Sequence, residues 1–213
     1  MPLEGIVTAV EPQRRKGGRR VNVFVEGRYA FSLERDLASL VRVGQPITEL
    51  KSAELLLEDE RARAFEAALA FLAPRPRSER EIRDRLARND VPDPVVEVTL
   101  ERLRHLKLVD DEAFARYWIE QRQTHRPRGS RMLRAELLQK GVASETAAEA
   151  VEESDQTEDP VQAAVRAGER KARSLARLDA RTFAQRLVQF LVRRGFDYDT
   201  ARSACRRLWE VAQ

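Results

Sequence analysis

The chain has 213 residues, of which 42% are hydrophobic and 35% are charged. The apolar content excludes wholesale disorder, while a charged fraction above the roughly 25% of average soluble domains favours several small units over one thick globule. Its net charge of +4 is too small to indicate nucleic-acid binding by itself. The single cysteine, Cys205, excludes an intramolecular disulfide and any multi-cysteine metal site. Since no apolar run approaches the ~18 residues of a membrane span, we expect a cytoplasmic protein without a membrane partner.

The first ~50 residues differ from the rest because their apolar residues alternate. Apolar residues at alternate positions of 21–25 and 29–33 flank the dipeptide Glu26-Gly27, which predicts a β-hairpin with a two-residue turn. A third strand at 5–10 would complete a small antiparallel sheet, and Leu37, Leu40 and Val41 predict a short helix. Residues 1–51 are therefore expected to form an N-terminal β extension.

From about Ser52 onward the apolar spacing is helical to the end of the chain. Ser78-x-x-Glu81 predicts a capping box, Asp93-Pro94 and Asp159-Pro160 predict helix starts, and Gly141 and Gly195 predict helix ends. The nine predicted helices are about 52–73, 78–88, 94–106, 111–123, 129–140, 145–152, 160–175, 180–194 and 198–211.

These helices repeat in threes, which predicts three tandem units at 52–109, 110–155 and 156–213. The equivalent positions are Ile82, Leu86, Asp90, Val91, Val96 and Leu100, then Leu133, Leu137, Gly141, Val142, Ala147 and Val151, then Leu187, Leu191, Gly195, Phe196, Ala201 and Cys205. The offsets are 51 and then 54 residues. A unit of ~50 residues buries little alone, so stacking is expected. The acidic segment 149–160 predicts a longer linker before the third unit.

Two stretches resemble the RecX family of regulators of the RecA recombinase. They are AALAFLAPRPRSEREIRDRL at 67–86 and LVDDEAFARYWIEQRQTHRPRGSRMLRAELLQKG at 108–141. The chain departs from the family pattern at Asn89-Asp90, where a Lys-Gly-like turn is usual. The resemblance implies a mainly α protein of three tandem three-helix repeats, elongated and curved. It also implies binding in the groove of the RecA–DNA filament and inhibition of ATP hydrolysis, strand exchange and co-protease activity in homologous recombination, DNA repair and the SOS response.

Arginines recur at equivalent places in successive repeats; Arg77 and Arg128, for example, differ by the offset of 51. Side chains at the same end of stacked repeats would form a stripe suited to phosphates or to carboxylates of a partner protein. The alternative is a set of solvated helix ends with local ion pairs. The candidate contact residues are Arg75, Arg77, Arg80, Tyr117, Arg122, Arg126, Arg128, Arg131, Arg134, Lys140, Arg193 and Arg194.

A second basic group lies in the predicted hairpin loop RRKGGRR at 14–20. Its candidate contact residues are Arg14, Arg15, Lys16, Arg19 and Arg20. This loop would touch DNA or an acidic patch on a partner, and the alternative is a merely solvated loop.

No combination of residues predicts an enzyme, a cofactor or a metal site. Asp110, Asp111 and Glu112 fit a helix start better than a metal site, because carboxylates there cap N–H groups and face the helix dipole. Phe114 and Trp118 are expected in the helical core, and Cys205 as a buried small hydrophobe.

A monomeric regulator of the RecA filament, with weaker and non-specific contacts to single- or double-stranded DNA, is the leading hypothesis. The alternatives are a sequence-independent DNA-binding protein acting through phosphate contacts and a helical scaffold for an unrelated partner. Salt dependence distinguishes the first two, because binding through phosphates alone weakens steeply as salt rises.

Overall fold

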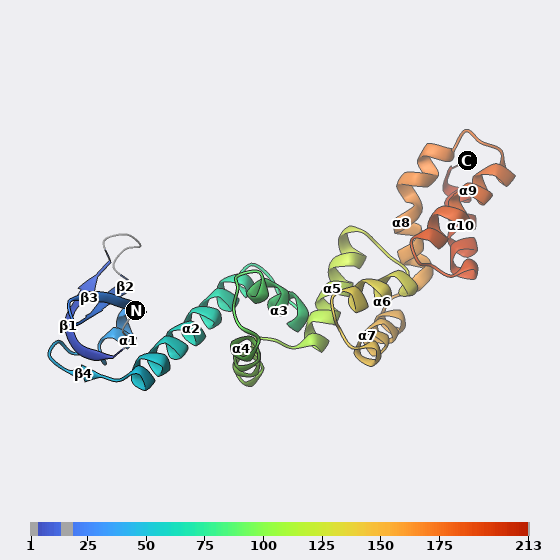
Figure 1. Cartoon of the computed structure of the whole chain (residues 1–213). Helices are drawn as coiled ribbons and strands as arrows, with labels where there is room; N and C mark the ends of the chain where they lie inside the picture. Colours follow the sequence, from blue (N-terminus) through green and yellow to red (C-terminus); the bar gives the residue numbers. More distant parts are fainter. Residues whose placement is uncertain (1–3, 14–18, 213) are drawn as a thin grey trace. The chain divides into compact units, whose positions relative to one another are not determined.

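The computed structural model describes residues 4–13 and 19–212, and it is mainly helical with a small antiparallel sheet at the N-terminus, as predicted (Figure 1). The chain divides into two compact units. The first comprises Met1–Phe71 and Arg85–Arg102, and the second comprises Leu72–Asp84 and Leu103–Gln213.

The sheet of the first unit has four strands in the order β3-β2-β1-β4, and the pairings are antiparallel. The predicted hairpin is β2 (Arg20–Val25) and β3 (Arg28–Glu34), and β1 (Gly5–Pro12) is the predicted third strand. Glu26 and Gly27 have φ of 50° and 72°, which matches the turn that twisted hairpin strands require. The sequence did not predict β4 (Pro46–Ile47), and the predicted loop is shorter because Arg20 already belongs to β2.

A buried ion pair ties the sheet to α2 (Glu49–Leu72), the first long helix. The Asp59 side chain is 4% exposed, and its Oδ2 lies 2.9 Å from Nη2 of Arg20. Asp59 Oδ1 also accepts a hydrogen bond from the backbone N–H of Glu34 at 2.6 Å, and Arg20 Nη2 donates to the carbonyl of Ser32 at 2.6 Å. Because Asp59 and Arg20 both make further hydrogen bonds to the backbone, the free-energy cost of removing their charges from water is offset.

The remaining helices follow the predicted positions closely, after the short helix α1 (Arg35–Ala38). They are α3 (Glu79–Ala87), α4 (Asp93–His105), α5 (Asp111–His125), α6 (Ser130–Gln139), α7 (Ser144–Thr157), α8 (Pro160–Leu175), α9 (Ala180–Arg193) and α10 (Tyr198–Ala212). As predicted, Asp159 caps α8 by accepting a hydrogen bond from Val161 N–H at 2.9 Å.

The predicted acidic linker at 149–160 is wrong, because α7 continues through most of it to Thr157. Buried Ala147, Ala150 and Val151 hold one face of α7 in the core, and the acidic residues lie on its other faces. Glutamate has good helix propensity, so an apolar-poor segment can continue a helix that is anchored elsewhere.

The threefold repeat is confirmed by the turn that ends the second helix of each repeat. Asp90, Gly141 and Gly195 all have positive φ, at 57°, 85° and 95°. In each turn the residue after them donates its N–H to a carbonyl five residues back, as in a Schellman turn. These bonds join Val91 to Leu86 at 3.2 Å, Val142 to Leu137 at 3.1 Å and Phe196 to Leu191 at 3.3 Å.

The second and third repeats each have their own apolar core within the second unit. Phe114, Leu133 and Leu137 are fully buried in the core of α5, α6 and α7, and Trp118 packs against this core. In the core of α8, α9 and α10, Phe183 lies edge-on to Trp209, with ring centroids 4.9 Å apart. Cys205 is buried there, as predicted.

Candidate functional site

Two equivalent helix-end junctions lie within the second unit. At the first junction the start of α3 meets the end of α6, and Ser78 Oγ donates a hydrogen bond to the carbonyl of Lys140 at 2.6 Å. At the second junction the start of α6 meets the end of α9, and the Gly129 N–H donates to the carbonyl of Arg194 at 3.0 Å. Ser78 and Gly129 are related by the repeat offset of 51, and Lys140 and Arg194 by the offset of 54. A carbonyl at a helix end therefore accepts a hydrogen bond at equivalent positions in both junctions, from a side-chain hydroxyl in the first and from a backbone N–H in the second.

Close backbone approach holds both junctions together. A Cβ on Gly141 would collide with the Arg80 side chain, and a Cβ on Gly195 would collide with Met132. A Cβ on Gly129 would overlap the backbone of Gly195. Glycine is therefore required at these positions by contact as well as by the positive φ of Gly141 and Gly195.

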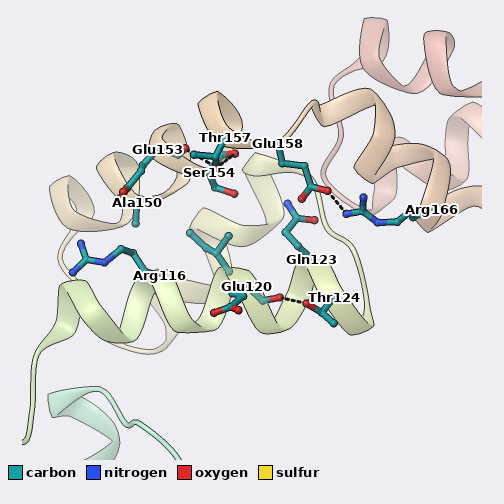
Figure 2. Close-up of a pocket in the computed structure, with 11 residues that line it drawn as sticks. Arg116, Glu120, Gln123, Thr124, Ala150, Glu153, Ser154, Thr157, Glu158 and Arg166 are labelled. Carbon is teal, nitrogen blue, oxygen red and sulfur yellow. Dashed lines mark hydrogen bonds and ion pairs between the residues drawn. The ribbon is translucent and has the colours of Figure 1, made fainter.

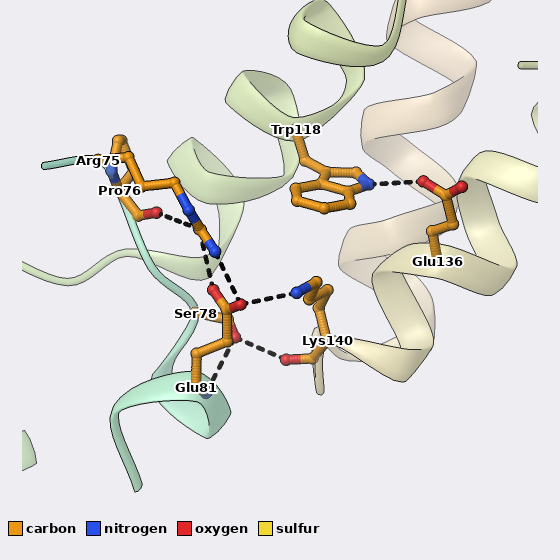
Figure 3. Close-up of polar contacts among 7 residues, drawn as sticks. All are labelled: Arg75, Pro76, Ser78, Glu81, Trp118, Glu136 and Lys140. Atoms are coloured by element: carbon orange, nitrogen blue, oxygen red, sulfur yellow. Dashed lines mark hydrogen bonds and ion pairs between the residues drawn. The ribbon is translucent and has the colours of Figure 1, made fainter. Parts of the chain in front are cut away.

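An ionic cluster closes the first junction (Figure 3). The Glu81 carboxylate accepts hydrogen bonds from Arg75 Nη1 and Nη2 at 3.1 and 3.0 Å and from Lys140 Nζ at 2.7 Å. Burial alone would raise the pKa of Glu81, but these bonds and the two positive charges lower it to about 2. Ser78 Oγ accepts from the Glu81 N–H at 3.2 Å, so half of the predicted capping box is present while the carboxylate binds the two cations.

Asp110 and Asp111 cap two different helices. Asp110 Oδ1 accepts from the N–H of Glu112 at 2.8 Å and Ala113 at 3.1 Å, which confirms the predicted start of α5. Asp111 Oδ1 instead accepts from the N–H of Glu79 at 2.9 Å and so caps α3, a role that the sequence did not predict. Burial is the main cause that raises the pKa of Asp111.

Trp118 lies between the ionic cluster and α6. The Lys140 Nζ is 4.8 Å and the Arg122 guanidinium carbon 4.5 Å from its ring centroid, which are cation–π distances. Its indole Nε1 donates to Glu136 Oε2 at 2.9 Å, and Arg122 Nε donates to the same oxygen at 2.6 Å. Trp118, which the sequence predicts in the core, thus also contacts the charged side chains of Lys140, Arg122 and Glu136.

The second junction gathers three guanidinium groups. Arg194 lies over the Phe190 ring, with 4.7 Å from its guanidinium carbon to the ring centroid. Burial lowers the pKa of Arg194, and the charges of Arg128 and then Arg126 lower it further. Arg128 Nε is 3.8 Å from Glu136 Oε1, the carboxylate that already binds Trp118.

Comparison with known proteins identifies the helical repeats. Family models match residues 64–103 as the first three-helix domain of RecX, residues 110–151 as the second and residues 157–205 as the third. The chain belongs to the RecX family. Its three matched segments contain the α3–α6 and α6–α9 contacts described above.

The curated relatives of this RecX chain are named regulatory protein RecX. One from Levilactobacillus brevis is 34% identical over 142 residues, covering 66% of this chain and 53% of the relative. One from Halalkalibacterium halodurans is 34% identical over 147 residues, covering 66% and 55%. The chain thus spans about half the length of the curated relatives it matches.

Two solved structures share the fold. A crystal structure of regulatory protein RecX aligns with a TM-score of 0.69 at 26% identity, covering 92% of this chain and 96% of that chain. RecX from Lactobacillus salivarius aligns with a TM-score of 0.62 at 22% identity, covering 71% and 97%.

The structure brings most of the predicted contact residues to the two junctions. Arg77 and Tyr117 are half-buried. Burial lowers the pKa of Arg77, and the neighbouring charge of Arg75 lowers it further. Arg80 packs against Gly141. The exposed candidates are Arg80, Arg126, Arg131, Arg134 and Arg193, of which Arg131 donates to the carbonyl of Val192 at 2.9 Å.

The candidate contact residues of the predicted loop at 14–20 do not share one environment. Arg14, Arg15 and Lys16 lie outside the described residues, and Arg19 is exposed. Arg20 is bound by Asp59 within the first unit, so its guanidinium serves the fold.

The sequence did not single out Glu136, and it assigned Glu81 only a capping role. Both carboxylates bind cations from other helices, and no local pattern marks such partners. The repeat offset of 51 residues places Met132 at the sequence position equivalent to Glu81.

A groove of about 550 Å³ lies between α5 and α7 and reaches Arg166 of α8 (Figure 2). Ile119 and Ala150 supply its apolar part, while Glu120 and Glu153 line its polar part. Glu158 pairs with Arg166 at one end.

Within the described ranges no group of His, Cys, Asp or Glu could hold a metal ion. Across the same part of the chain, no helix has the length and apolar character to cross a membrane.

Proposed function

We propose that this chain regulates the RecA recombinase by binding in the groove of the RecA–DNA filament. Bound there, it inhibits ATP hydrolysis, strand exchange and co-protease activity. Membership of the RecX family supports the regulatory role, and the matched relatives are regulatory proteins by name. The chain acts as a cytoplasmic monomer that performs no chemistry of its own.

The observation that carries the proposal is the network of charges across the two junctions, here called the junction network. The cationic side chains that pair with or lie beside Glu81 and Glu136 outnumber these two carboxylates. The cationic members are Arg75, Arg77, Arg122, Arg126, Arg128, Lys140 and Arg194. A net positive surface of this kind suits the phosphates and carboxylates of a nucleoprotein filament.

Packing at the two junctions holds the backbone that carries these cationic side chains in a fixed arrangement. Each junction is held by a backbone carbonyl at a helix end and by a glycine contact without space for a side chain. The guanidinium groups are therefore carried on packed helix ends. A preorganised surface loses less entropy on binding than one on mobile loops.

Exposed arginines of this region provide the test. Charge reversal by Arg126→Glu with Arg134→Glu should raise the protein concentration needed to bind preassembled RecA filaments, because neither residue is buried. Arg170→Glu with Arg173→Glu on α8 makes the same charge change elsewhere on the exposed surface and serves as the control. Co-sedimentation with filaments measures binding, and far-UV circular dichroism checks that the helices remain. Equal loss in both pairs, or no loss in the first, contradicts the proposed surface.

The second candidate function is sequence-independent DNA binding without RecA. The cluster of Arg126, Arg128 and Arg194 favours it, because guanidinium groups bind phosphate. The two functions are separated by concentration: a filament regulator inhibits RecA well below the concentration that saturates free DNA.

A further inference from the structure

A groove of about 710 Å³ lies between α6 and α7, and its two walls carry opposite charges. The exposed Arg131 and Arg134 belong to the α6 wall, and Glu152 and Asp155 belong to the α7 wall. Along its whole sequence α7 carries no basic residue, and α6 carries a single carboxylate, that of Glu136. The surface of the second repeat is thus divided into a basic strip and an acidic strip that run side by side.

The charges of the two walls are not paired with each other. Among residues 4–13 and 19–212, Arg134 and Glu152 form no ion pair. Arg131 donates a hydrogen bond to a backbone carbonyl of α9, and Asp155 accepts one from Ser130 Oγ. Both walls therefore keep charge that can be matched by another molecule.

Polarity also changes along the length of the groove. The hydrogen bond from Ser130 to Asp155 joins the start of α6 to the end of α7, and a short turn joins the other two ends. The two helices therefore run in opposite directions. Because a helix rises ~1.5 Å per residue, Arg134 lies about level with Glu152, and Leu138 lies one turn further from the polar end. The far end of the groove is apolar, and Leu138 is 42% exposed there.

We propose that this groove binds the same groove of a second copy of the chain, so that the free protein forms a reversible symmetric pair. A two-fold axis that runs along the groove exchanges the walls, because α6 of one copy then lies over α7 of the other. Each position keeps its level along the groove under this rotation. Arg134 of each copy therefore faces Glu152 of the other, and the two apolar ends meet at Leu138.

The other two-fold arrangement does not match the surface. With the axis across the groove, α6 would lie over α6, so that arginine would face arginine and the apolar end would face the polar end. A ligand with charges of one sign would be attracted by one wall and repelled by the other. A second copy supplies both signs at the spacing of the groove itself. Since Leu138 is the main apolar contact, we expect a weak pair that depends on concentration.

Pairing of the free protein is compatible with its action as a monomer. The pair covers Arg134, one of the two exposed arginines used above to test filament binding. A chain must therefore leave the pair before this arginine can contact a filament, which makes the pair a resting form. This consequence rests on the proposed function, whereas the pairing itself does not and is measured without RecA or DNA.

Exchange of the charges tests the pairing by sedimentation velocity. The sedimentation coefficient of the wild-type protein should rise with protein concentration. Arg134→Glu alone and Glu152→Arg alone should each raise the dissociation constant about tenfold, because like charges then face each other at two places. An equimolar mixture of these two variants should restore association, since one chain then carries two acidic residues and the other two basic residues at the facing positions.

The matched controls lie on the exposed surface of α8. Arg170→Glu and Glu169→Arg make the same two changes of charge outside the groove and should leave association at the wild-type level. Far-UV circular dichroism of each variant checks that the helices remain.

A wild-type protein that sediments as a monomer at every concentration overturns the proposal. An association that neither groove variant weakens also overturns it, as does one that the mixture fails to restore, because the two walls would then not face each other. A protein that pairs as described and leaves RecA activity unaffected overturns the proposed function and not the pairing.

Discussion

The ionic cluster at the first junction makes the stability of the second unit depend on Glu81. Replacing it by Glu81→Gln preserves the side-chain shape and removes the charge that Arg75 and Lys140 share. The pKa of Glu81 is about 2, against an ordinary value of 4.5. Each unit of lowering corresponds to ~1.36 kcal/mol, and the Glu81 side chain is 15% exposed. After allowance for solvent screening, we expect a loss of about 2 kcal/mol at neutral pH.

The sign of the pH dependence follows from the lowered pKa. A carboxylate with a lowered folded-state pKa stabilises the fold above its unfolded-state pKa, and this contribution is lost as the pH falls through the folded-state value. The difference in unfolding free energy between wild type and Glu81→Gln should therefore be constant above about pH 5 and shrink as the pH falls toward about 2.

Tryptophan fluorescence during urea unfolding measures this difference, since Trp118 and Trp209 both lie in the second unit. Glu153→Gln, at an exposed glutamate of α7, is the control and should show a difference near zero at every pH. A Glu81→Gln difference below ~0.5 kcal/mol at neutral pH, or one that does not shrink in acid, refutes the reasoning.

Three further changes test the packing. Gly195→Ala should lower the thermal unfolding midpoint of the second unit and reduce its free energy of unfolding by ~2–3 kcal/mol. The added Cβ would collide with Met132, and the positive φ of residue 195 is unfavourable for alanine. An unchanged midpoint would contradict the close contact. Asp59→Asn should destabilise the first unit by ~3 kcal/mol in urea unfolding, since it leaves the half-buried Arg20 guanidinium without its charged partner, and a neutral effect would argue against that pair. The thiol of Cys205 should react with a disulfide reagent only as fast as the protein opens, because the thiol is buried and burial also raises its pKa; rapid labelling of the folded protein would disprove this.

The fold followed from the sequence wherever the signal was periodic and local. Alternation predicted the hairpin, helical spacing predicted the long helices, and the repeat offsets predicted the turns at Asp90, Gly141 and Gly195. The end of α7 was not predictable in this way, because its anchoring residues precede the acidic segment that continues the helix. The two-residue strand β4 is too short to show a period.

The candidate site was predictable in its members and not in their partners. Repeat equivalence indicated the arginines now found at the junctions. The carboxylates that bind the predicted cationic residues come from distant positions: Glu81 is 59 residues from Lys140 at the first junction, and Asp59 is 39 residues from Arg20 in the first unit. Such pairings depend on tertiary packing, so a local pattern cannot distinguish a neutralised cation from one left for a ligand.

The central claim, regulation of RecA, is tested most directly by titrating the wild-type protein into RecA filaments on single-stranded DNA while following ATP hydrolysis. We expect inhibition that saturates at protein concentrations too low to coat the free DNA. The absence of inhibition at every ratio of this protein to RecA would contradict it.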